Sequence, residues 1–126
     1  MAGRIMIVDD TPMIRAMLRD LLEEVGYEVV AEVGTGEEAV KRYPELKPDL
    51  LTMDLCMPDM DGMEAMTKIL AIDPEATIII SSSMGWSSSM TAAIKAGAKD
   101  FLIKPVQPDH FLKVVKAHLD KKLGKG

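Results

Sequence analysis

Four short apolar segments of this chain each end in polar residues of a different chemical kind. The segment at 5–8 leads into Asp9 and Asp10, the one at 50–53 into Asp54, the one at 78–80 into three serines, and the one at 101–103 into Lys104. Segments of this length are typical of buried strands. If the strands are parallel in one sheet, three carboxylates, a hydroxyl and an ammonium meet at the same edge. Such a set of groups suits a divalent cation and a phosphoryl group.

The charges of these groups indicate what they could do together. Asp9, Asp10 and Asp54 would repel one another unless a cation lies between them. Mg²⁺ is the expected cation, because it prefers oxygen ligands and is commonly held by one or two carboxylates plus phosphate oxygens. An exposed Asp54 carboxylate could then attack phosphorus and form an acyl phosphate. The Lys104 ammonium could neutralise one phosphoryl oxygen, while a serine hydroxyl donates a hydrogen bond to another. Each residue alone is common in structural roles, and only the combination indicates a site.

Helical repeats separate the apolar segments. Helices are predicted at 12–25, 37–46, 63–72, 87–96 and from 108 onward, and an imperfectly alternating strand at 27–33 is expected at a sheet edge. Thr11 is expected to cap the first helix, with Pro12 in its first turn. Strands that alternate with helices imply right-handed crossovers and a parallel sheet covered on both faces. The sequence therefore predicts an α/β domain built from β-α units.

The composition limits the classes of protein that the chain can belong to. A length of 126 residues with 48% hydrophobic residues fits one domain with a core of ordinary size. The net charge of -5 argues against binding to nucleic acid through an overall basic field. Neither a membrane span nor a signal peptide is indicated, so the expected location is the cytoplasm. The single cysteine, Cys56, cannot form an internal disulfide, which agrees with a reducing compartment.

On these residues the chain resembles the receiver domains of bacterial two-component response regulators, over essentially its whole length. The matching residues are Asp9-Asp10 after the first strand, Asp54 followed by Met57-Pro58 and Asp61-Gly62, Ser82, Phe101, and Lys104-Pro105. The resemblance implies that residues 1–126 form one receiver domain. It also implies a flavodoxin-like (βα)5 doubly wound parallel sheet with five strands in the order 2-1-3-4-5. In that order the first and third strands are neighbours, which would bring the three aspartates across one crevice.

The resemblance also implies a role for each site residue. Asp54 would accept phosphate from a kinase histidine. Asp10, Asp54 and the backbone carbonyl of Cys56 would ligate Mg²⁺, and Asp9 would act largely through water. Lys104 would contact the phosphoryl group. No other cofactor is implied.

Two further residues are implied to switch on phosphorylation, Ser82 and Phe101. Ser82 is one of three consecutive serines, so Ser81 and Ser83 remain alternatives for the switch hydroxyl. Phe101 lacks a hydroxyl, so any signal from its rotamer would have to come from burial alone. The resemblance further implies a cis peptide bond before Pro105.

The implied function is a phosphorylation-driven signalling switch whose output is binding, so the protein is not expected to be an enzyme beyond its own phosphorylation and dephosphorylation. The segments 82–85 and 96–101 look most like stand-alone chemotaxis regulators of the CheY type. Phosphate on Asp54 would draw in Ser82, turn Phe101 inward and reshape the surface of the fourth helix, fifth strand and fifth helix. The protein is expected to be a monomer. Its implied partners are a sensor histidine kinase of the chemotaxis type, a target such as a flagellar motor switch protein and, where one exists, a phosphatase.

Three other functions compete with this one. A receiver domain cut from a longer response regulator would have the same sequence features. An enzyme of the haloacid dehalogenase type also uses an aspartyl nucleophile and Mg²⁺, but it carries a D-x-D motif and a cap domain, whereas this chain has Asp9-Asp10 and no room for a cap. A pseudo-receiver that binds partners without phosphorylation usually lacks part of the acidic cluster, which is complete here.

Overall fold

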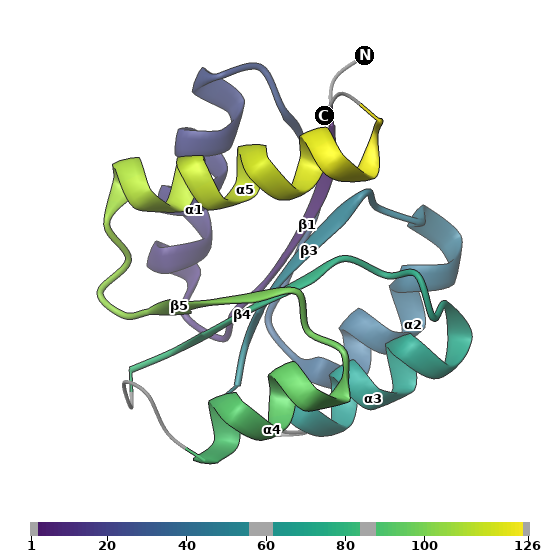
Figure 1. Cartoon of the computed structure of the whole chain (residues 1–126). Helices are drawn as coiled ribbons and strands as arrows, with labels where there is room; N and C mark the ends of the chain where they lie inside the picture. The colour runs from purple at the N-terminus through teal and green to yellow at the C-terminus, as the bar shows by residue number, and fades with distance from the viewer. Residues whose placement is uncertain (1–2, 56–61, 84–87, 125–126) are drawn as a thin grey trace.

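Strands and helices alternate along the chain in the computed structural model, which describes residues 3–55, 62–83 and 88–124 (Figure 1). The strands are β1 Arg4–Val8, β2 Glu28–Val33, β3 Leu50–Asp54, β4 Ile78–Ser82 and β5 Asp100–Ile103. The helices are α1 Pro12–Glu24, α2 Gly36–Leu46, α3 Gly62–Ile72, α4 Ser88–Ala96 and α5 Pro108–Lys122. All strand pairs are parallel, and the strand order is β2-β1-β3-β4-β5. This order confirms the expected flavodoxin-like doubly wound α/β fold.

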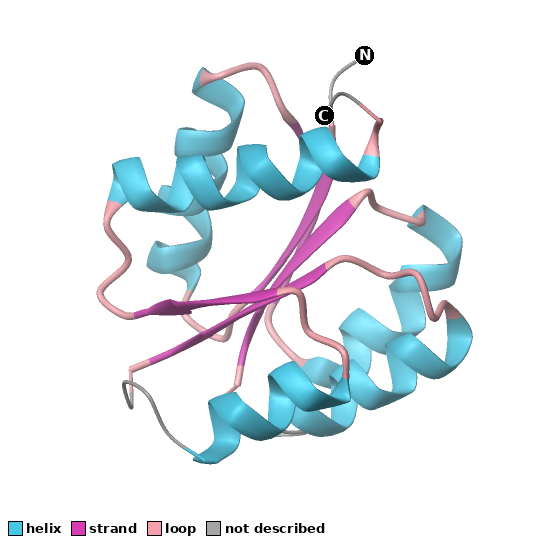
Figure 2. Cartoon of the chain, in the orientation of Figure 1, coloured by secondary structure: helices cyan, strands magenta, loops and turns pink. Residues whose placement is uncertain are grey.

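Helices cover both faces of the sheet, with α1 and α5 on one face and α2, α3 and α4 on the other (Figure 2). Successive residues of β1 serve the two cores in turn: Ile5 and Ile7 pack with Leu22 and Phe111, whereas Met6 packs into the core under α2 and α3. Because both faces are buried, the inner strands are continuous apolar runs. Strand β2 lies at one edge of the sheet and is only partly buried, as expected for an edge strand.

The start of α1 differs from the expectation. Thr11 occupies the N-cap position, but its side chain makes no capping hydrogen bond, so the predicted cap is wrong. Instead, the backbone N–H of Thr11 donates to Asp9 Oδ1 at 2.9 Å, which forms an Asx turn ahead of the helix. Pro12 occupies the first turn of the helix and has no N–H to be capped. Helix α2, by contrast, has a side-chain cap: the Thr35 hydroxyl accepts a hydrogen bond from the Glu38 N–H at 3.1 Å.

The remaining elements lie within one or two residues of their predicted bounds. Cys56 and the turn-rich segment that follows it to residue 61 lie outside the described residues, as do residues 84–87. No helix in the described part of the chain combines the length and the apolar character that a membrane span requires.

Candidate functional site

Acidic side chains from two neighbouring strands meet at the carboxyl edge of the sheet. Asp9 and Asp10 directly follow β1, and Asp54 is the last residue of β3. These two strands are paired, and the strand order reverses between them. One carboxylate oxygen from each of the three aspartates lies within 4.8 Å of the others. The fold thus places the predicted acidic cluster at the topological switch point, where doubly wound sheets bind ligands.

Lys104 supplies the positive charge of the cluster. Its ammonium donates to Asp9 Oδ2 at 2.7 Å and to Asp54 Oδ2 at 3.2 Å. The peptide bond between Lys104 and Pro105 is cis, in agreement with the expectation. Partial burial, the strongest single influence, lowers the pKa of Lys104, but the hydrogen bond and the charge of Asp9, together with Asp54, outweigh it and raise that pKa above its usual value. The ammonium therefore stays charged and offsets the repulsion between the two buried carboxylates.

The expectation that Asp54 is exposed is wrong. Only 6% of its side chain is exposed, whereas Asp10 is exposed to solvent. Asp54 ends a central strand between β1 and β4, and the start of α3 packs against its backbone. A Cβ added to Gly62 would lie 2.6 Å from the Asp54 carbonyl oxygen, so only glycine allows this close approach.

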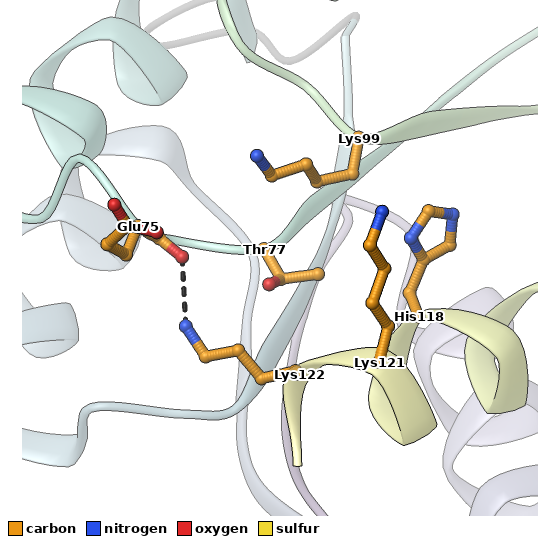
Figure 3. Close-up of a pocket in the computed structure, with 6 residues that line it drawn as sticks. All are labelled: Glu75, Thr77, Lys99, His118, Lys121 and Lys122. Carbon is orange, nitrogen blue, oxygen red and sulfur yellow. Dashed lines mark hydrogen bonds between the residues drawn. The ribbon is translucent and has the colours of Figure 1, made fainter. Parts of the chain in front are cut away.

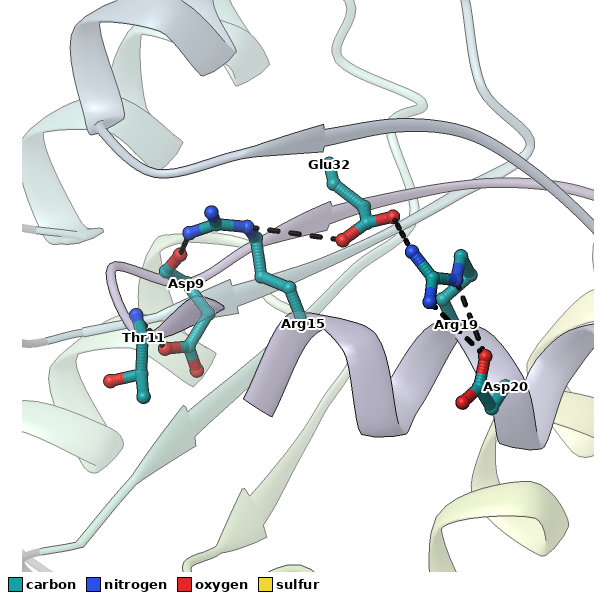
Figure 4. A network of polar contacts seen from close by, with 6 residues as sticks. All are labelled: Asp9, Thr11, Arg15, Arg19, Asp20 and Glu32. Carbon is teal, nitrogen blue, oxygen red and sulfur yellow. Dashed lines mark hydrogen bonds and ion pairs between the residues drawn. The ribbon is translucent and has the colours of Figure 1, made fainter. Parts of the chain in front are cut away.

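The backbone and the side chain of Asp9 are both held in place (Figure 4). Its N–H donates to the Val33 carbonyl at 3.1 Å, and its carbonyl accepts from Arg15 Nη1 at 2.5 Å. Its two carboxylate oxygens accept from the Thr11 N–H and the Lys104 ammonium. The contact of Arg15 was not predictable from the sequence, because a contact with a backbone carbonyl leaves no pattern of residue types.

The serines that end β4 lie beside this cluster. Ser81 and Ser82 are buried and Ser83 is exposed, while Ser81 is the register partner of Asp54. The Ser82 carbonyl accepts a hydrogen bond from the Lys104 N–H at 2.9 Å, which ties the end of β4 to the residue after β5. That bond involves the backbone and not the hydroxyl, so the assignment of Ser82 as the switch hydroxyl stays a prediction. On β5, Phe101 is half-buried and packs against the core on the α2 to α4 side of the sheet.

The donor set fits the cation expected from the sequence. Three carboxylates offer hard oxygen ligands, and carboxylates favour Mg²⁺ or Ca²⁺ over softer metals. Asp10 is exposed and engages in no ion pair in the described structure, so it can turn to a metal without breaking an existing contact. The acidic cluster could therefore bind a divalent metal.

A second polar region lies at the opposite end of the strands. A cavity of about 250 Å³ is lined by Glu75, Thr77, Lys99, His118, Lys121 and Lys122 (Figure 3). Lys122 donates to the Glu75 carbonyl at 2.9 Å, and His118 contacts Asp100 at 2.9 Å. Since Thr77 and Lys99 directly precede β4 and β5, this cavity is far along the strands from the acidic cluster. It contributes no residue to the carboxylate site.

Comparison with known proteins agrees with this geometry. Residues 5–116 match the family model of the response regulator receiver domain. The chain belongs to this family. The chemotaxis protein CheY of Thermotoga maritima and this chain are 49% identical over 115 residues, which make up 91% of this chain and 96% of the relative.

Solved structures of receiver domains share the fold. A CheY-like response regulator receiver domain protein from Methanospirillum hungatei has a TM-score of 0.92 and 29% identity, with 100% of both chains covered. The structure of a complex of CheX, CheY, BeF3 and Mg²⁺ from Borrelia burgdorferi matches with a TM-score of 0.88 and 29% identity, over 91% of this chain and 87% of that one. The chain is a receiver domain of the CheY type, consistent with a phosphorylation-activated signalling switch in chemotaxis.

Proposed function

We propose that this receiver domain accepts a phosphoryl group from a histidine kinase on Asp54 and then binds a target protein. One observation carries the proposal: the carboxylates of Asp9, Asp10 and Asp54 converge within 4.8 Å, and the Lys104 ammonium contacts two of them. Asp54 is the member of the cluster that belongs to a strand, and the Lys104 ammonium lies 3.2 Å from its carboxylate. That arrangement suits an oxygen nucleophile whose product carries extra negative charge.

The residues of the cluster share the tasks of the proposed transfer. Asp9, Asp10, Asp54 and the Cys56 carbonyl would hold Mg²⁺, which when bound neutralises charge on phosphoryl oxygens; Cys56 lies outside the described residues. An Asp54 oxygen forms a bond to phosphorus while the bond between phosphorus and the kinase histidine nitrogen breaks. The imidazole keeps that electron pair and takes up a proton. Lys104 gives up its contact with Asp54 Oδ2 and neutralises a phosphoryl oxygen.

The output of the switch is a change of surface. In this proposal the Ser82 hydroxyl moves to the phosphoryl group, and Phe101, half-buried on the neighbouring strand opposite Ile80, turns inward. The affected surface is formed by α4, β5 and α5. Support comes from the backbone hydrogen bond between Lys104 and Ser82, because this bond links the two strand ends that the phosphoryl group would contact.

The proposed partners follow from the CheY relatives. They are a chemotaxis-type histidine kinase, a target such as a flagellar motor switch protein, and a phosphatase where one exists; the CheY of Borrelia burgdorferi is found in complex with CheX. We propose a cytoplasmic monomer, since kinases that draw on ATP act in the cytoplasm. Nucleic acid is not among the proposed partners, because the chain is acidic overall.

Intact mass spectrometry after incubation with acetyl phosphate and MgCl₂ tests the proposal. The wild type should gain one phosphate that hydroxylamine removes, as expected for an acyl phosphate. Asp54→Asn should gain none, because the amide is not a nucleophile at this position. Ser88→Ala, at the start of α4, serves as a matched control that should label like the wild type.

Two outcomes would contradict the proposed function. Equal labelling of the wild type and Asp54→Asn would show that Asp54 is not the acceptor. Sustained release of phosphate from a phosphomonoester would instead indicate an aspartyl phosphatase.

A further inference from the structure

The peptide group between Asp9 and Asp10 joins two of the three clustered carboxylates. Its carbonyl oxygen belongs to Asp9, at the point where β1 has just ended. The Asp9 N–H donates to the carbonyl of Val33, and β2 ends at Val33. The strand ladder therefore does not supply a donor for the Asp9 carbonyl. The orientation of this peptide sets where both side chains leave the backbone.

Arg15, one turn into α1, supplies the missing donor. Its Nη1 donates to the Asp9 carbonyl, while its Nε lies 4.0 Å from Glu32 Oε1 on β2 (Figure 4). The other oxygen of Glu32 accepts from Arg19 Nη1 at 2.9 Å. The side chain of Arg15 is 19% exposed, whereas that of Arg19 is 38% exposed. Glu32 thus holds two arginines of one helix face, and only Arg15 reaches the peptide of the acidic cluster.

Gly34 makes room for this contact. A Cβ at that position would lie 3.1 Å from Arg15 Nη1 and 4.0 Å from the Asp9 carbonyl oxygen. The glycines with positive φ in the described chain are Gly26, Gly97 and Gly124, so Gly34 has a backbone conformation that alanine can adopt. Glycine at position 34 therefore provides space beside the Arg15 guanidinium, and its backbone angles alone do not require glycine.

We propose that Arg15, held by Glu32 and accommodated by Gly34, is a positioning residue for metal binding at the acidic cluster. This inference rests on the proposed function. Arg15 touches no carboxylate of the cluster; it holds the peptide that orients Asp9 and Asp10. Because Mg²⁺ demands near-ideal octahedral geometry, a small rotation of that peptide weakens binding. Residues that orient metal ligands typically change metal affinity by about 10- to 100-fold when they are replaced.

The test measures Mg²⁺ affinity directly. MgCl₂ is titrated into ¹⁵N-labelled protein at constant ionic strength, and the dissociation constant is taken from the amide NMR signals near the acidic cluster. Arg15→Gln should weaken binding about tenfold. Arg19→Gln is the matched control, because it removes the same charge from the same helix face and the same Glu32 without touching Asp9. Its dissociation constant should change less than twofold.

A second variant separates position from charge. Gly34→Ala keeps every charge but adds a Cβ against the guanidinium, so it should also weaken Mg²⁺ binding. The double variant Arg15→Gln with Gly34→Ala should bind Mg²⁺ no more weakly than Arg15→Gln alone, since the added Cβ acts only by displacing the guanidinium that Arg15→Gln removes. Purely additive losses would overturn the inference, and so would equal effects of Arg15→Gln and Arg19→Gln.

The outcomes also separate this inference from the proposed function. A wild type that binds no Mg²⁺ and accepts no phosphate would refute the proposed function. A wild type that binds Mg²⁺ and is labelled at Asp54, together with an Arg15→Gln variant of unchanged affinity, would refute only the positioning role. A general loss of folding would lower the melting temperature of the metal-free variants without the selective effect on the dissociation constant.

Discussion

Thr52 shows at the scale of one residue how a buried polar atom affects stability. It lies in the middle of β3 between its register partners Ile7 and Ile79, and its Oγ1 has no hydrogen-bond partner among the described residues. A buried hydroxyl without a partner costs about 1–3 kcal/mol. Thr52→Val keeps the shape of the side chain and should raise the free energy of unfolding by about 1 kcal/mol in urea denaturation. Thr52→Ala, which leaves a cavity, should show no such gain; a lower stability for the valine variant would contradict the reasoning.

At the scale of elements, one hydrogen bond ties α2 to the turn that follows α3. The Tyr43 hydroxyl donates to Asp73 Oδ2 at 2.8 Å, and the other oxygen of Asp73 accepts from the Glu75 N–H at 3.0 Å. Burial, more than the hydrogen bond to Asp73, raises the pKa of Tyr43 above its usual value. The folded state therefore favours the neutral phenol more than the unfolded state does. This contribution to stability is complete below about pH 10, the unfolded pKa, and is lost as the pH rises through the folded pKa.

The raised pKa of Tyr43 leads to a prediction for the stability at alkaline pH. From about pH 9 to pH 11 the free energy of unfolding of the wild type should fall more steeply than that of Tyr43→Phe, which has no phenol to ionise at this position. Urea denaturation across this range measures both slopes. Burial also raises the pKa of Tyr27, the other tyrosine of the chain, so Tyr27→Phe measures the part of the slope that this residue contributes. Identical slopes for the wild type and Tyr43→Phe would exclude the proposed linkage.

At the scale of the whole molecule, the acidic cluster links metal binding to the stability of the fold. Asp9 and Asp54 come from different strands, so the site exists only when the sheet is formed. A ligand that binds only the folded state at tenfold excess over its dissociation constant adds about 1.4 kcal/mol to the free energy of unfolding. MgCl₂ should therefore raise the melting temperature of the wild type, and CaCl₂ should raise it less if octahedral geometry matters. Asp10→Asn should reduce the shift; a melting temperature indifferent to Mg²⁺ would mean that the carboxylates share no cation.

The elements were predictable where the signal is local. The apolar run at 5–8 and the helical repeat after Pro12 each lie within one element, and both formed where expected. The strand order was available only through the resemblance to receiver domains. The cap predicted for Thr11 did not form; instead the Thr11 N–H joins an Asx turn with Asp9, and the propensity of threonine for N-cap positions does not report this turn.

The sequence by itself determined which groups could take part in the site, because the type of residue that ends each apolar segment is written in the chain. It thereby predicted Asp9, Asp10, Asp54 and Lys104 as one cluster. Only the tertiary structure decided that Asp54 is buried and that Lys104 bridges Asp54 and Asp9, partners 50 and 95 residues away in sequence. It also decided that Arg15 holds the Asp9 carbonyl. Exposure and backbone contacts depend on what packs around a residue, and every residue type has the same carbonyl, so neither leaves a pattern in the sequence.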